Sequence, residues 1–167
     1  MLVAVDVHYK ESYAKTVLLL FENWQSEIPI EVIEVNIDHV EEYIPGAFYK
    51  RELPCITEAL KKIDLEQVTL FIVDGYIYVD NKGGYGLGGH LYAALGERIP
   101  VVGVAKTQFQ ANKETVVEVF RGESKNPLYV SAIGMDKEWV AEQVQSMHGE
   151  FRLPYLLKLM DTKTKEE

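Results

Sequence analysis

One carboxylate interrupts the apolar stretch Leu2-Val3-Ala4-Val5-Asp6-Val7, which is otherwise typical of a buried strand. A second run of the same kind, Leu70-Phe71-Ile72-Val73-Asp74-Gly75, ends in a carboxylate. An ionised carboxylate beside a hydrophobic core is costly unless it is paired, hydrogen-bonded or bound to a metal ion. Asp6 and Asp74 are therefore the first candidates for a functional site, although Asp-Gly is also a common turn pair.

A third carboxylate, Glu52, lies in Arg51-Glu52-Leu53-Pro54, at the head of an amphipathic stretch, where an ordinary helix-surface residue is the plainer interpretation. Converging carboxylates repel one another, so a divalent cation is their natural partner. Mg²⁺ is the default cation for oxygen ligands, and Mn²⁺ is the substitute that we expect. Such a cluster suits metal-assisted phosphoryl chemistry. We therefore expect the oxygens of Asp6, Glu52 and Asp74 to converge within a few ångströms.

The composition indicates one soluble globular domain: the chain has 167 residues, of which 47% are hydrophobic and 26% are charged. No apolar run approaches the roughly 20 residues of a membrane span, and we expect no signal peptide. Cys55 is the only cysteine, which excludes an internal disulfide and favours a reducing, cytoplasmic setting. It is more typical of a small buried hydrophobe than of a nucleophile.

The net charge of -9 argues against a protein that coats nucleic acid by bulk electrostatics. This net charge still allows an enzyme that binds a phosphodiester at one local site, through metal ions and a few cationic side chains. We expect any such groove to be a local basic patch built from Lys50, Arg51, Lys82 and Lys106.

The apolar pattern predicts three early strands, then a helix, and then alternating strands and helices. We expect strands at 3–9, 16–21, 30–37, 70–73, 101–105, 116–120 and 128–131, and helices at about 47–63, 87–95, 139–147 and 155–159. Asp136 is a plausible N-cap for the third helix. This order predicts an α/β fold with a mixed sheet flanked by helices. With one Asp inside the first strand and another at the end of a later one, the layout matches a ribonuclease H-like core.

The chain resembles a specific family, endonuclease V. The likeness lies in several blocks that occur in the family's order: Val5-Asp6-Val7-His8-Tyr9, Tyr43-Ile44-Pro45-Gly46 with Arg51-Glu52-Leu53-Pro54, Val73-Asp74-Gly75 with Gly86-Leu87-Gly88-Gly89-His90-Leu91, residues 99–106, Pro127-Leu128-Tyr129-Val130-Ser131, and Phe151-Arg152-Leu153-Pro154. We expect a single domain over residues 1–161, a frayed tail over 162–167, and a monomer.

The resemblance implies a metal-dependent endonuclease, a hydrolase that nicks DNA or RNA beside a deaminated base, typically hypoxanthine in deoxyinosine or inosine. It implies that Asp6, Glu52 and Asp74 bind the metal and that Lys106 is the active-site lysine. Tyr43, with Ile44 and Pro45, would be the wedge that separates the strands around the lesion. Three glycines, Gly46, Gly86 and Gly89, would let the backbone approach the extracted base. His90 is a further candidate contact to substrate, although a histidine on a helix of small residues is more often a packing residue.

The sequence also departs from the family pattern in two places. Asp80-Asn81-Lys82 stands where the family usually has His-Pro-Arg, and Gly134-Met135-Asp136 stands where it has Gly-His-Arg. Each replacement makes the groove less cationic. Two alternatives to an active nuclease therefore stay open. One is a divergent member that binds metal or nucleic acid with weak or altered catalysis, and the other is an interaction domain that kept only the fold.

Overall fold

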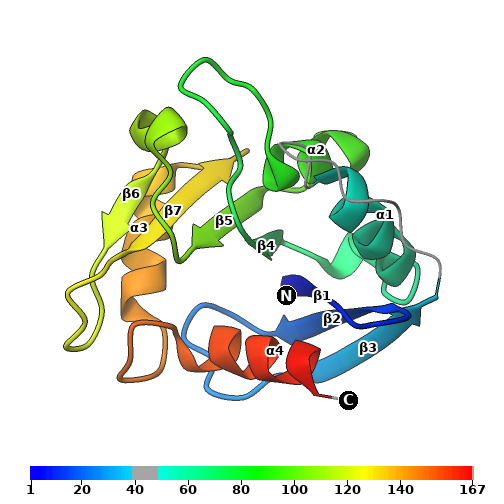
Figure 1. Ribbon diagram of the computed structural model, residues 1–167. Helices are drawn as coiled ribbons and strands as arrows, with labels where there is room; N and C mark the ends of the chain where they lie inside the picture. The colour runs from blue at the N-terminus through cyan, green and yellow to red at the C-terminus, as the bar shows by residue number, and fades with distance from the viewer. Residues whose placement is uncertain (39–48, 167) are drawn as a thin grey trace.

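The computed structural model describes residues 1–38 and 49–166, and within them seven strands form one mixed sheet in the order β3-β2-β1-β4-β5-β7-β6 (Figure 1). The strands are β1 (Leu2–Tyr9), β2 (Ala14–Phe21), β3 (Glu31–Ile37), β4 (Leu70–Asp74), β5 (Val101–Ala105), β6 (Val117–Val119) and β7 (Leu128–Ile133). The helices are α1 (Tyr49–Leu60), α2 (Leu87–Ala94), α3 (Lys137–Ser146) and α4 (Tyr155–Lys165), with short 3₁₀ turns η1 (Leu65–Gln67) and η2 (Gln110–Thr115). The predicted α/β class and the order of the elements are confirmed.

The central strands β1, β4 and β5 run parallel, whereas β2, β3, β6 and β7 pair antiparallel with their neighbours. Parallel central strands are covered on both faces, which explains why their sequences are almost continuously apolar. Val5 pairs with Val73 in the register of β1 and β4. Asp6 and Asp74 follow these residues directly, so they lie side by side where β4 ends and β1 continues to Tyr9.

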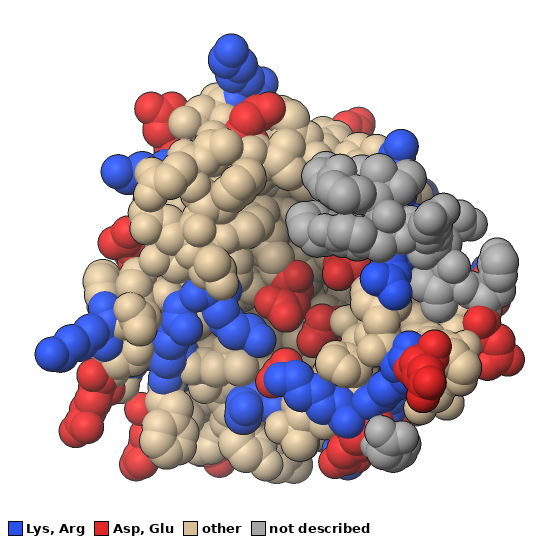
Figure 2. All heavy atoms as spheres, viewed as in Figure 1, with Lys and Arg blue, Asp and Glu red and all other residues tan. Residues whose placement is uncertain are grey.

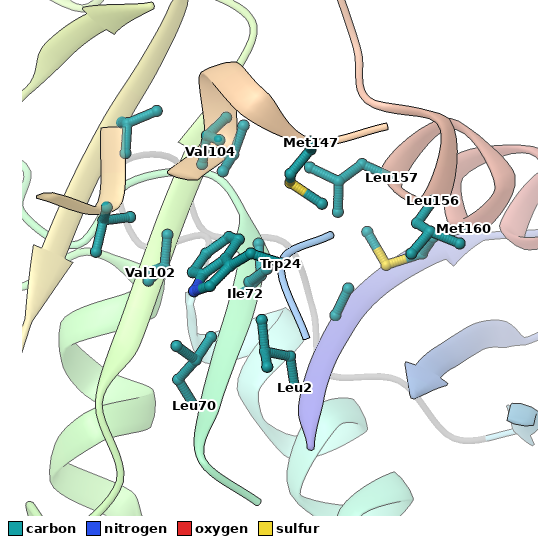
Figure 3. Close-up of a cluster of buried hydrophobic side chains, with 14 of the residues drawn as sticks. Leu2, Trp24, Leu70, Ile72, Val102, Val104, Met147, Leu156, Leu157 and Met160 are labelled. Carbon is teal, nitrogen blue, oxygen red and sulfur yellow. The ribbon is translucent and has the colours of Figure 1, made fainter. Parts of the chain in front are cut away.

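Two hydrophobic layers enclose the sheet. One lies under α3 and α4, where Leu156, Leu157 and Met160 pack over Ile72 and Val104 (Figure 3). The other lies under α1 and α2 and contains Ile56, Phe71 and Leu91. Side chains alternate between the faces of a strand, so Asp6 points to the same face as Ala4, the face that α4 covers.

The final helix is longer than the sequence predicts. The helix expected over 155–159 continues as α4 to Lys165, with Thr164 buried, so the predicted fraying from residue 162 is wrong over 162–165. Two lysines of the β1–β2 hairpin explain the extension: Lys10 donates to the Lys165 carbonyl at 2.8 Å and Lys15 donates to the Glu166 carbonyl at 3.1 Å. Cations at this end of a helix satisfy its free carbonyls and complement its dipole.

The other helices agree with the sequence prediction in place and differ slightly in length. Asp136 caps α3, as expected, by accepting a hydrogen bond from the Trp139 N–H at 3.1 Å. In the described part of the chain, α1 begins at Tyr49 and ends at Leu60, three residues before the predicted end, and Pro54 lies inside it. No helix of residues 1–38 and 49–166 has both the length and the apolar character that crossing a membrane requires.

Candidate active site

The candidate carboxylates gather at the carboxyl ends of the central strands. Asp6 and Asp74 come from the neighbouring strands β1 and β4, and Glu52 comes from the first turn of α1. Lys106 follows directly after β5, the next strand along the sheet. The carboxyl edge of parallel strands is the usual place for ligand sites in such sheets. These residues are far apart in the sequence, but they lie near one another because β1, β4 and β5 are neighbours in the sheet.

Burial and mutual repulsion change the acidity of this group. The pKa of Asp6 is raised to about 8, first by burial and then by the charge of Asp74, while the Val7 N–H, which donates to Asp6 Oδ1 at 2.9 Å, acts in the opposite direction. The pKa of Glu52 is raised to about 7 by burial and by Asp74. Burial also raises the pKa of Asp74, although Lys106 opposes the shift. The structure therefore brings the three predicted carboxylates into electrostatic contact.

Asp161 is a fourth acidic residue here, and the sequence analysis did not single it out. Its side chain lies on α4 and is 11% exposed, and its Oδ1 lies 3.6 Å from Lys106 Nζ. The same ammonium lies 3.8 Å from Asp74 Oδ2, so Lys106 stands between the two carboxylates. A signal was present: Asp161 falls four residues after Leu157, on the apolar stripe of the helix, where a carboxylate is unexpected.

The carboxylate oxygens are ligands of the type that a hard cation prefers, but the side chains are not arranged around one metal position. Among residues 1–38 and 49–166, no three His, Cys, Asp or Glu side chains are arranged so that they could hold a metal ion together. The expectation that the three carboxylates converge within a few ångströms is therefore not met. Figure 2 shows acidic side chains inside a central hollow with basic side chains along part of its rim. The oxygen donors still fit Mg²⁺ or Mn²⁺ by type.

A pocket of about 460 Å³ adjoins the carboxylates. Glu52 and Asp74 form part of its wall, and the rest is largely aromatic and apolar. Its aromatic lining residues are Tyr49, Tyr76, Tyr85 and Phe109. Asp74 also lines a second, narrow cleft of about 20 Å³ that it shares with Asp6, Lys106 and Asp161. Asp74 therefore lies where the aromatic pocket meets the cleft under α4.

The substrate-binding residues expected from the sequence fall into three groups. Gly86 lines the aromatic pocket. Gly89 and His90 lie behind its wall: a side chain at Gly89 would meet the Tyr85 ring, and His90 stacks on Tyr49 with ring centroids 3.6 Å apart. Tyr43, Ile44, Pro45 and Gly46, the proposed wedge, lie outside the described residues.

Two arginines fix the segment that leads into α4. Arg152 donates to the backbone carbonyls of Lys106 and Pro127, and so ties this segment to the ends of β5 and β7. Arg121, which is 5% exposed, donates hydrogen bonds to five other backbone carbonyls. These are the carbonyls of Gln145, Met147, Gly149, Phe151 and Arg152. The position of Lys106, and of the helix that carries Asp161, therefore depends on arginines outside the site.

Similarity to known proteins identifies the family of the chain. The family model of endonuclease V matches residues 1–162. The chain belongs to the endonuclease V family. No curated protein matches the chain in the sequence comparison.

Solved endonuclease V structures show the same fold at low identity. Human endonuclease V superposes with a TM-score of 0.76 at 20% identity, over 98% of this chain and 82% of the human chain. Endonuclease V from Bacillus subtilis gives a TM-score of 0.73 at 21% identity, over 98% and 77% of the two chains. Endonuclease V from Ciona intestinalis, in complex with a DNA that contains an inosine followed by a ribo-adenosine, gives 0.79 at 15%, over 98% and 84%. The ribonuclease H-like core expected from the sequence is confirmed.

One of the two departures from the endonuclease V pattern, Asp80-Asn81-Lys82, has a structural role in this chain. Asp80 organises its own turn by accepting hydrogen bonds from the N–H groups of Lys82 and Gly84. The Asn81 side chain accepts a hydrogen bond from the Glu114 N–H, and the buried Asn112 donates to the Tyr78 carbonyl at 2.8 Å. These bonds brace the aromatic wall of the pocket against η2. The residues at this departure therefore act as supports of the pocket.

Proposed function

We propose that this endonuclease V family member is a metal-dependent endonuclease that nicks DNA or RNA beside a deaminated base such as hypoxanthine. One observation supports the proposal above all: Glu52 and Asp74, two half-buried carboxylates of raised pKa, form part of the wall of a large aromatic pocket near the carboxyl ends of the central strands. A pocket for a base next to oxygen ligands for a metal is the combination that such a reaction needs. The inosine-containing complex of the Ciona intestinalis protein, which shares this fold, supports the choice of lesion.

Asp6, Glu52 and Asp74 would each turn a carboxylate oxygen towards the metal, since they are not gathered around one point in this structure, and Asp161 lies beside them on the α4 side. When bound, a divalent cation supplies an activated water and stabilises charge on the leaving oxygen. Lys106 lies within 4 Å of both Asp74 and Asp161, and its ammonium would offset negative charge that develops on a phosphate at the mouth of the cleft. Arg152 would keep Lys106 in position through its hydrogen bond to the Lys106 carbonyl.

The aromatic pocket would receive the base after it leaves the helix. Removing a base from the stack costs less at a defective pair, and aromatic rings repay part of that cost by stacking. Tyr76 and Phe109 face each other across 6.0 Å between ring centroids, at an interplanar angle of 42°. Gly86 also lines the wall, but a side chain there would meet the Tyr76 carbonyl oxygen at 2.9 Å, so the absence of a side chain serves the packing of the loop behind the pocket.

Nicking of inosine-containing strands tests the proposal directly. With Mg²⁺ or Mn²⁺, we expect the protein to cut DNA or RNA oligonucleotides that contain one inosine, and to leave matched adenosine oligonucleotides and EDTA controls intact. Gel analysis of labelled strands gives the position of the nick and the preference between DNA and RNA. Specific binding to inosine without any cut would favour the alternative of a divergent binding domain.

The acidity of the site predicts how stability depends on pH. Ordinary values are 3.8 for Asp and 4.5 for Glu, whereas Asp6 and Glu52 have pKa values of about 8 and about 7 in the fold. The folded protein therefore binds more protons than the unfolded chain between these limits, and the metal-free protein loses stability as the pH rises through them. Cation binding needs the ionised carboxylates, so Mg²⁺ should raise Tm more at about pH 8 than at about pH 5.5.

Differential scanning fluorimetry with Mg²⁺ or EDTA measures this effect. The variant Asp6→Asn should flatten the pH dependence of the metal-free protein, because it removes the carboxylate whose pKa is raised to about 8. An equal rise of Tm on adding Mg²⁺ at both pH values would contradict the assignment of these carboxylates to the metal.

A further inference from the structure

Three lysine ammonium groups surround the single carboxylate of Asp161. Lys106 approaches Oδ1 at 3.6 Å, while Lys158 and Lys165 approach Oδ2 at 3.8 and 3.1 Å. Lys10 adds a fourth ammonium at the end of the same helix, where it binds the Lys165 carbonyl. Four basic residues therefore lie around Asp161 and Asp74, which share Lys106, in a chain whose net charge is -9. We name Lys158 and Lys165, with Lys10, the α4 rim.

Stability of α4 does not account for this concentration of charge. One lysine at i+3 or i+4 is enough to pair with Asp161, and Lys106 already occupies its other oxygen. Additional ammonium groups on one carboxylate repel one another and stay largely in water: the side chains of Lys158 and Lys165 are 65% and 59% exposed. Exposed cations close to a cluster of carboxylates raise the local potential where the rest of the surface is negative.

We propose that the α4 rim binds the phosphates of the nucleic-acid strand that passes through the active site. This inference rests on the proposed function and adds to it the path of the strand. Asp74 lines both the aromatic pocket and the cleft that Lys106 and Asp161 share, so a strand whose base occupies the pocket leads its neighbouring phosphates towards α4. Lys158 and Lys165 lie on the same helix face as Asp161 and meet those phosphates next.

The α4 rim contributes affinity that does not depend on the base. Phosphate contacts position a strand and carry no sequence information, whereas the pocket distinguishes the base. The lysines should therefore act equally on inosine and adenosine strands. Each contact to a duplex phosphate contributes about 0.9 to the slope of log K against log salt concentration.

Salt-dependent binding tests the α4 rim. The double variant Lys158→Gln/Lys165→Gln is compared with its parent in an Asp74→Asn background with Mg²⁺, which keeps the strand uncut, by fluorescence anisotropy on short inosine and adenosine duplexes. We expect the salt slope to fall by about 1.8, two contacts at about 0.9 each. We also expect affinity at low salt to fall roughly tenfold or more on both duplexes.

The matched control is Lys61→Gln/Lys62→Gln, which removes the same charge from two exposed lysines. They follow the last residue of α1, whereas Glu52 lies in its first turn. The slope of this control should equal that of the parent. An unchanged slope in the α4 variant, or an equal fall in the control, would overturn the α4 rim and leave the proposed function standing. A parent protein that binds neither inosine DNA nor inosine RNA at any salt concentration would overturn both. Circular dichroism of each variant establishes that the fold is kept.

Discussion

Asp74→Asn is expected to lower metal-dependent nicking of inosine strands by roughly 10²–10³-fold, the cost of one lost electrostatic contact at a reacting centre. The substitution keeps the shape of the side chain and removes the charge that faces Lys106 at 3.8 Å. The same change should raise the Tm of the metal-free protein, because it relieves repulsion with Asp6 and Glu52. Single-turnover nicking and scanning fluorimetry with EDTA measure the two effects.

Glu118→Gln is the matched control for this variant. It removes one negative charge from an exposed position on the edge strand β6, outside the candidate site, and should change neither the nicking rate nor the effect of Mg²⁺ on Tm. If wild type and Asp74→Asn both show negligible nicking, and Mg²⁺ shifts the Tm of neither, the chain is an interaction domain that kept the fold without the chemistry.

Arg121→Leu is expected to destabilise the protein by about 3 kcal/mol or more, because it deprives five backbone carbonyls of a buried, charged donor. For a domain of this size, that corresponds to a fall in Tm of about 6–12 °C. Arg121→Lys should be almost as damaging, because one ammonium cannot reproduce the planar fork of a guanidinium. Urea denaturation of wild type and both variants gives the free energies of unfolding.

Arg98→Leu provides the comparison, since Arg98 is exposed and its loss should change the free energy of unfolding by no more than about 0.5 kcal/mol. A loss below about 1 kcal/mol in Arg121→Leu would show that water replaces the guanidinium at these carbonyls. The segment before α4 would then hold its shape without the arginine.

The contrast between Arg51 and the α4 rim shows where sequence patterns stop being informative. Charge alone places Arg51 among the groove cations, yet its guanidinium lies over the Tyr9 ring, 3.6 Å from the centroid. In the sequence, Lys158 appears as an ordinary residue of a short terminal helix, and Lys165 falls in the predicted frayed tail. Their significance depends on Asp161, and that of Asp161 depends on Lys106. Long charged side chains can point in many directions, and only the packing of their helix selects one.

The strands and three candidate carboxylates could be predicted from the amino-acid sequence, because both leave local signals. An apolar run of four or five residues predicts a buried strand, and an aspartate within it or at its end is conspicuous against its neighbours, as Asp6 and Asp74 are. Glu52 needed the family spacing as well. Other features appear only in the folded chain. The helix α4 continues to Lys165, and Asp161 joins the site. Arg121 and Arg152 support the segment before α4, and an aromatic pocket opens beside the carboxylates. Each of these depends on residues far apart in the chain that meet because the sheet order β1-β4-β5-β7 and the docking of α4 bring them together.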